Sequence, residues 1–326
     1  AFVLFRQKKM LLFFIFSMLL GGALQLTNAY GDSFLQDANV FPKGGIINNF
    51  FASSPPNRHK AAAVLLPFTS FPADNLADII DIHDTGDFNF LNKRVPFFDK
   101  GDSTIMGHCR AAIEQVLGRP CPRNIPTMVE GDWNDGLSCI GFDGTAESIW
   151  LGMFFYGILT DWSEMLAQLK DARSRKDRAR YMAKAKRIKD AINKYAWDGN
   201  WYIRATYAHG VLGSKKCRIG KMWINSNTWA LIHDIATPAR RKKVLDSLSK
   251  ILYRDYGPLT FYPAFSKPDP GIGHLSQYAP GLRENGGLYT HAGCWAIIAE
   301  AIAGTPERCY KVVNSFGYLR EFFFLN

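Results

Sequence analysis

Residues 147–169 read ESIWLGMFFYGILTDWSEMLAQL, a long stretch in which apolar residues dominate on every side. A run of this length without strict alternation predicts a helix that is buried all round. Thr160 and Asp161 interrupt the apolar run, so we expect a break near them. The next segment, residues 174–196, keeps the helical spacing but is strongly polar. A buried helix followed by a solvated one indicates helices packed in layers.

Further helices are predicted where a capping residue precedes an apolar run. Thr237-Pro238 and Thr305-Pro306 each place a cap before a proline at the first helical position. The remaining predicted helices span 75–82, 103–117, 227–235 and 292–303, and the best strand signal covers 201–206. The sequence therefore predicts an all-α fold, in which long loops gather at one end of a helical layer.

Composition excludes several classes of protein. Of 326 residues, 47% are hydrophobic, which is too many for an intrinsically disordered chain. The 39 Lys and Arg exceed the 29 Asp and Glu by ten, but much of the excess lies between Lys170 and Lys194 on a single predicted helix. This pattern favours a solvated helix face, and we expect no nucleic-acid partner. None of the six cysteines has zinc-ligand spacing, so no metal site is predicted.

The amino-terminal segment, residues 1–31, contains an apolar run that differs in composition from the rest of the chain. Residues 10–31 carry no charge and follow Arg6, Lys8 and Lys9, the outline of a signal peptide or short membrane anchor. A core helix or a stretch foreign to the folded domain explains the same run. Both interpretations stay open; export or membrane contact is expected only under the first.

The most informative polar stretch is Gly131–Gly136, which reads GDWNDG. It suits a sharp loop that presents Asp132 and Asp135 beside the indole of Trp133. A sugar ring stacks its C–H face on such an indole while carboxyl groups take its hydroxyls. A carboxyl group kept protonated against an apolar wall can also donate a proton to a glycosidic oxygen. A plain Asx turn explains the spacing equally well.

A second polar loop reads RENGG over residues 283–287 and runs into the predicted helix from 292. His291 then falls at the helix start, where backbone N–H groups and the helix dipole favour an anion. The sequence indicates a phosphate or carboxylate site there. A capping or purely structural histidine is the alternative.

The runs GDWNDGL, ESIWLGMF and QYAPGLRENGGLYTHAGCW, with smaller blocks between them in the same order, resemble the catalytic domain of glycoside hydrolase family 94. The resemblance covers residues 75–315. It implies an (α/α)6 barrel, a toroid of six helical hairpins with its site at one end, of which residues 32–326 would form a partial catalytic domain. It also implies an inverting phosphorylase that cleaves a β-linked glucoside with inorganic phosphate and releases a sugar 1-phosphate.

The resemblance also implies roles for individual residues. Asp135 matches the catalytic acid. The substrate-binding positions match Trp133, Asp132, Arg283, Glu284 and, in an altered upstream block, Asp32. His291 matches a phosphate-binding histidine. Phosphate is already an anionic nucleophile, so one acid and an anion site suffice, with no cofactor and no metal.

Departures from the family pattern leave alternatives. The block near Asp32 lacks the family's arginine, and the family's Thr-Gly phosphate loop has no counterpart in residues 292–326. An inverting hydrolase that uses Glu147 or Glu284 as its base is one alternative, and a truncated sugar-binding remnant without catalysis is another. A sugar phosphate product favours a cytoplasmic location. A homodimer is compatible with the sequence.

Overall fold

The computed structural model describes residues 87–97, 101–128 and 131–316. They divide into two compact units, one ending at Pro120 and one beginning at Cys121, and each is described by itself. The apolar segment 1–31, the predicted sugar ligand Asp32 and the helix predicted over 75–82 lie outside the described residues. Their roles, and the division of the chain at residue 32, stay predictions.

The first unit is a short hairpin leading into one helix. After the 3-10 turn η2 (Phe88–Asn92), strands β1 (Arg94–Pro96) and β2 (Asp102–Thr104) pair in antiparallel register. Helix α5 (Ile105–Leu117) follows, and the Thr104 hydroxyl accepts a hydrogen bond from the Gly107 amide at 3.0 Å. The helix predicted over 103–117 is therefore confirmed, with its cap one residue later than Ser103.

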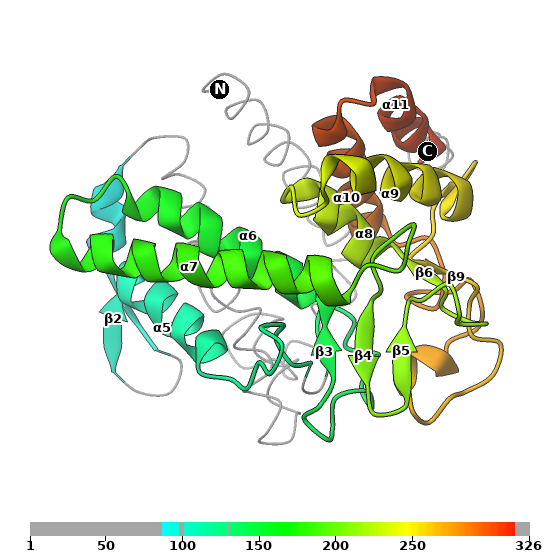
Figure 1. The fold of residues 1–326 in the computed structure, drawn as a ribbon, viewed down its shortest axis with the longest axis horizontal. Helices are drawn as coiled ribbons and strands as arrows, with labels where there is room; N and C mark the ends of the chain where they lie inside the picture. Colours follow the sequence, from blue (N-terminus) through cyan, green and yellow to red (C-terminus); the bar gives the residue numbers. More distant parts are fainter. Residues whose placement is uncertain (1–86, 98–100, 129–130, 317–326) are drawn as a thin grey trace, which may run out of the picture. The chain divides into compact units, whose positions relative to one another are not determined.

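The second unit is built from three helical hairpins (Figure 1). The hairpins pair α6 (Ile149–Leu166) with α7 (Ala172–Tyr195), α8 (Ile224–Ile232) with α9 (Pro238–Ile251), and α10 (Thr290–Ala303) with α11 (Pro306–Ser315). Helix α6 contacts α8, and α8 contacts α10. These three helices form an inner layer, and the more polar second member of each hairpin lies outside it.

The inner helices are buried because their sequences are apolar around most of the circumference. Helix α6 alone buries Trp150, Met153, Phe155 and Leu159. The predicted break at Thr160 is wrong: α6 runs unbroken to Leu166. The Thr160 hydroxyl donates to the Tyr156 and Gly157 carbonyls of the preceding turn, so this polar side chain is satisfied without leaving the helix.

Helix α7 confirms the predicted solvated face. The Asp171 carboxylate accepts a hydrogen bond from the Ser174 amide at 2.8 Å and starts the helix. Its buried side is formed by Tyr181, Ala185, Ile188 and Ile192, while the basic residues lie mostly on the exposed side. Long cationic side chains keep their charged heads in water in this arrangement.

Short strands connect the hairpins at the end where the inner helices begin. Strands β3 (Glu147–Ser148), β4 (Ala205–Tyr207) and β5 (Gly210–Leu212) form one antiparallel sheet. Two further pairs join β6 (Met222–Trp223) to β9 (Phe261–Tyr262) and β7 (Tyr253–Arg254) to β8 (Gly257–Pro258). Of the strand predicted over 201–206, only the last two residues belong to β4. Helices dominate the described residues nonetheless, and none of these helices has the length and apolarity to cross a bilayer.

Candidate active site

A buried ion pair fixes the loop Gly131–Gly136 to the core. The Arg204 guanidinium lies 2.5 Å from Asp132 Oδ1, and both side chains are fully buried. The other oxygen, Oδ2, accepts a hydrogen bond from the Ser148 hydroxyl at 2.6 Å. Asp132 thus has no accessible oxygen to offer a ligand. This corrects the expectation that it contacts the sugar: its role is to hold the loop.

Asn134 extends the same network to a second inner helix. Its Oδ1 accepts from Arg204 at 2.9 Å and from the Asn225 amide at 3.2 Å. Asn225 is the second residue of α8, and Ser148 caps the first turn of α6 through the Leu151 amide. The loop is therefore attached to the amino-terminal ends of α6 and α8, where the helix dipoles are positive.

Two glycines allow the loop to bend so sharply. Gly131 has φ = 105°, a backbone conformation that side chains disfavour, and a Cβ there would lie 3.1 Å from the Asn134 carbonyl oxygen. At Gly136 a Cβ would lie 3.0 Å from the Leu275 Cβ. The loop closes on itself at one end and on the core at the other.

Trp133 connects the loop to the third inner helix. Its indole N–H donates to His291 Nδ1 at 3.3 Å, and its ring lies 4.8 Å from Trp295 and 5.2 Å from Tyr289 between ring centroids. His291 is the second residue of α10, so the predicted helix-start position is confirmed. Trp295 in turn stacks on Trp150 of α6 at 6.0 Å. The aromatic cluster thus ties the site to the helical core.

Charged groups from both predicted loops affect the pKa of the Tyr289 hydroxyl. Burial raises the pKa of Tyr289, and the carboxylates of Glu284 and Asp135 raise it further, while the Arg283 guanidinium acts in the opposite direction. Charged groups of both predicted loops thus contribute to the electrostatic environment of Tyr289. Asp135 itself is exposed.

Glu284 has a carboxylate oxygen that can still accept a hydrogen bond. Its side chain is 7% exposed, and Oε2 lies 3.5 Å from the Arg283 Nε but receives no hydrogen bond from any described residue. A buried oxygen of this kind gains from a ligand hydroxyl. Asn285 holds the loop rigid, because its amide bonds both the carbonyl and the N–H of Phe265 and the carbonyl of Tyr278.

His291 sits against aromatic rings on its inner side and solvent on its outer side. Its ring centroid is 5.6 Å from Trp133 and 5.0 Å from Trp295. Desolvation by these neighbours lowers the pKa of the imidazole. At neutral pH the ring is therefore uncharged.

Glu147 does not have the freedom that a catalytic base needs. It lies in β3, not in a helix, and is paired with Arg123 through both the Nε, at 2.8 Å, and a terminal guanidinium nitrogen. Thr206 of the neighbouring strand donates to the same oxygen at 3.2 Å. This pairing contradicts the expectation that Glu147 serves as the base of an inverting hydrolase.

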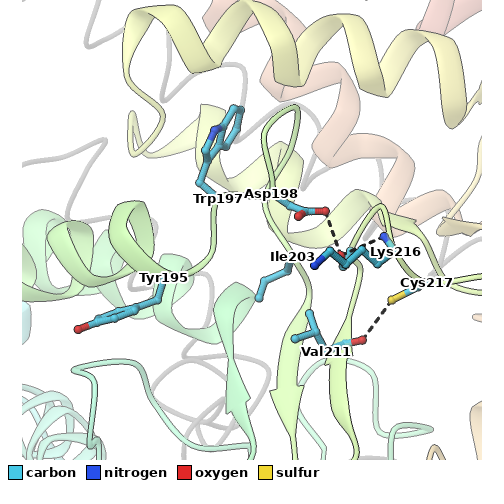
Figure 2. A pocket seen from close by; sticks show the side chains of 8 residues that line it. Tyr195, Trp197, Asp198, Ile203, Val211, Lys216 and Cys217 are labelled. Atoms are coloured by element: carbon cyan, nitrogen blue, oxygen red, sulfur yellow. Dashed lines mark hydrogen bonds between the residues drawn. The ribbon is translucent and has the colours of Figure 1, made fainter.

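A separate hollow of about 420 Å³ lies beside the β4–β5 hairpin (Figure 2). The carboxylate on its wall, Asp198, is already bonded by the Ser214 hydroxyl and the Lys215 amide. None of the predicted site residues lines it; its lining is Tyr195, Trp197, Asp198, Ile203, Val211, Ser214, Lys216 and Cys217. Trp133 and His291, two of the predicted site residues, lie in the aromatic cluster instead.

Sequence reasoning missed the residues that support the site. Arg204 is a single cation within an otherwise apolar run, WYIRA, and that contrast was a usable signal for a buried, paired charge. Asn225 and Ser148 carried no such signal, because polar residues near helix starts are ordinary caps. Tyr289, two residues before His291, had no predicted role.

The fold and the site define a class: a domain of helical hairpins that carries an aromatic, carboxylate-bearing loop over the starts of its inner helices. The chain belongs to the glycosyl hydrolase 94 superfamily, whose catalytic-domain model matches residues 76–318. It is 34% identical over 235 residues to a solabiose phosphorylase of Paenibacillus borealis, which is 72% of this chain and 30% of that protein. It is 30% identical over 240 residues to an N,N'-diacetylchitobiose phosphorylase of Vibrio furnissii, covering 72% and 29%.

The chain thus spans about a third of the length of these relatives. Residues 1–51 match a different model, that of the nucleoside H⁺ symporter family. A stretch of 42 residues, 13% of the chain, is 55% identical to a nucleoside permease of Escherichia coli, of which it covers 10%. The apolar segment at the amino terminus is therefore similar to part of a membrane transporter. In the sequence it precedes residues 76–318, which match the catalytic domain.

Proposed function

We propose that the site around Trp133 carries out inverting phosphorolysis of a β-linked glycoside. The observation that supports this most strongly is the hydrogen bond between Trp133 and His291. It joins the loop that carries the proposed acid, Asp135, to the start of the helix that carries the proposed phosphate ligand. The matched relatives are phosphorylases by name, which agrees with this assignment.

Asp135 serves as the general acid. Its carboxyl proton passes to the glycosidic oxygen as the bond from that oxygen to the anomeric carbon breaks. A phosphate oxygen attacks the same carbon from the opposite face, so the configuration inverts and a sugar 1-phosphate leaves. Because Asp135 is exposed, the bound sugar has to exclude water from its carboxyl group.

The sugar rests on the face of Trp133, and Glu284 accepts a hydrogen bond from one of its hydroxyls with Oε2, which receives none from a described residue. Arg283 lies over the Tyr278 ring at 4.6 Å and next to Glu284, where it can donate to a second sugar oxygen. These contacts orient the anomeric carbon toward the phosphate side of the site.

Phosphate is held at the starts of the inner helices. His291 occupies the second position of α10, and unbonded N–H groups of a first helical turn point outward from there. The positive ends of α6 and α8 lie under the same loop and add to the favourable potential for an anion. Phosphate then needs no base to activate it, and no cofactor enters the reaction.

The three hairpins supply half of an (α/α)6 barrel in this proposal. Inner helices α6, α8 and α10 follow one another in contact, each with its outer partner, as consecutive hairpins of such a toroid would. The site then lies at the end of the toroid where the inner helices begin.

An inverting hydrolase is the second candidate. It requires a carboxylate base for water, and Glu284 is the group with an oxygen free for that purpose. Phosphate dependence separates the two, because hydrolysis proceeds at an undiminished rate without phosphate.

The experiment that tests the proposed acid is the variant Asp135→Asn. Turnover of a β-linked disaccharide with phosphate should fall by about a hundredfold or more, while calorimetry shows sugar binding close to that of the wild type. Asp190→Asn, an exposed acid on α7, is the matched control and should keep full activity. Full activity of Asp135→Asn overturns the assignment.

A further inference from the structure

We propose that Trp133 is a positioning residue that fixes His291 in one tautomer, with the hydrogen on Nε2 and the lone pair of Nδ1 facing the indole. The inference deepens the proposed function, because it names how the phosphate ligand is prepared. It rests on that function for its catalytic meaning but not for its structural test.

The hydrogen-bonding groups of the two rings determine the tautomer. An indole nitrogen can only donate a hydrogen bond, and here it lies 3.3 Å from His291 Nδ1. Nδ1 must therefore act as the acceptor, which requires it to be unprotonated. In a neutral imidazole the hydrogen then sits on the other nitrogen, Nε2.

The alternatives each lose a bond or create a repulsion. If the imidazole were turned over, a carbon would face the indole and the N–H would have no acceptor there. If His291 carried a hydrogen on both nitrogens, two donors would face each other across 3.3 Å. Trp295, 5.0 Å from His291 between ring centroids, also covers the inner side of the imidazole, where a charged ring would lose part of its hydration.

The consequence is a directional donor for an anion. No described residue accepts the Nε2 hydrogen, so it stays available for a phosphate oxygen at the start of α10. The same tryptophan would carry the sugar on its face and set the phosphate donor through its edge. A displacement of the indole would then weaken both ligands together, which links their binding.

Tautomers are read directly by two-bond ¹⁵N–¹H correlation spectra of the full chain labelled at its seven histidines, with His291→Gln to assign the signal. We expect a single Nε2–H form in the wild type. Trp133→Phe keeps an aromatic ring but lacks the indole N–H. It should therefore give a mixture of tautomers and raise the KM for phosphate about fivefold, the usual effect of one neutral hydrogen bond.

Trp295→Phe is the matched control, since it trims an indole that packs on the same imidazole while the Trp133 bond remains. It should keep the single Nε2–H form. A wild-type His291 that carries its hydrogen on Nδ1, or a Trp133→Phe spectrum identical to that of the wild type, overturns the inference. These spectra need no turnover, so a chain that fails to phosphorolyse any glycoside would refute the proposed function while the tautomer assignment is judged separately.

Discussion

Arg204 and Asp132 form an ion pair of 2.5 Å in which neither side chain is exposed, directly beneath the loop that carries Trp133 and Asp135. The residues are 72 positions apart in sequence. A charge pair this deep is costly to desolvate, so its partners depend on each other. The geometry of the candidate site therefore depends on a contact between two side chains that are both shielded from solvent.

Replacing Arg204 by Met should therefore destabilise the chain by about 3–5 kcal/mol, because the Asp132 carboxylate is left buried without its cation. Denaturant unfolding measures the change. The double variant Arg204→Met with Asp132→Asn should recover part of the loss, since the stranded charge is gone.

The control for that experiment is Lys186→Met, which breaks an exposed pair with Asp190 on α7. Exposed pairs of this kind contribute little, so the unfolding midpoint should hardly move. An Arg204→Met chain as stable as the wild type would show that the buried pair does not support the loop.

His291→Gln should raise the KM for phosphate by about ten- to a hundredfold, the range expected when a hydrogen bond to a charged group is lost. The KM for the sugar should change far less. Initial rates over a grid of both substrates separate the two constants. His209→Gln, an exposed histidine in the β4–β5 turn, should behave as the wild type; an equal change in both variants would remove His291 from the phosphate site.

His233 gives the chain an acid-sensitive point. It lies against Trp229 at 5.2 Å and so close to α6 that a Cβ on Gly157 would come within 2.2 Å of its ring. Burial lowers its pKa from 6.5 to about 4. Between pH 6.5 and about 4 the unfolded chain binds a proton that the folded chain does not, so stability falls as the pH drops, by up to about 3 kcal/mol.

Unfolding free energies measured from pH 8 to pH 4 test this. His233→Gln should flatten the decline, and His209→Gln should leave it unchanged. If the wild type keeps constant stability down to pH 4, His233 is not held neutral by its surroundings.

Local signals in the sequence predicted the helices well. Helix α9 begins with Pro238 at its first position and α10 ends at Gly304, with φ = 71°, as predicted, although the Thr237 side chain makes no capping hydrogen bond. The apolar run of α6 predicted a buried helix because its composition allows no other stable placement. The error at Thr160 arose because a hydroxyl can bond within its own helix, which spacing alone does not reveal.

The site was only partly predictable. The position of His291 at a helix start follows from local sequence, but the pairing of Asp132 with Arg204, and of Glu147 with Arg123, does not. The sequence of a motif is the same whether its carboxylate faces a ligand or a buried guanidinium. Which of the two it faces is decided by contacts between segments far apart in the chain.

Phosphate dependence of glycoside cleavage tests the central claim most directly. The chain is incubated with a panel of β-linked disaccharides, with and without inorganic phosphate, and ³¹P NMR follows the products. Phosphorolysis predicts an α-configured sugar 1-phosphate that forms only when phosphate is present. Free reducing sugar released at the same rate without phosphate would contradict the account.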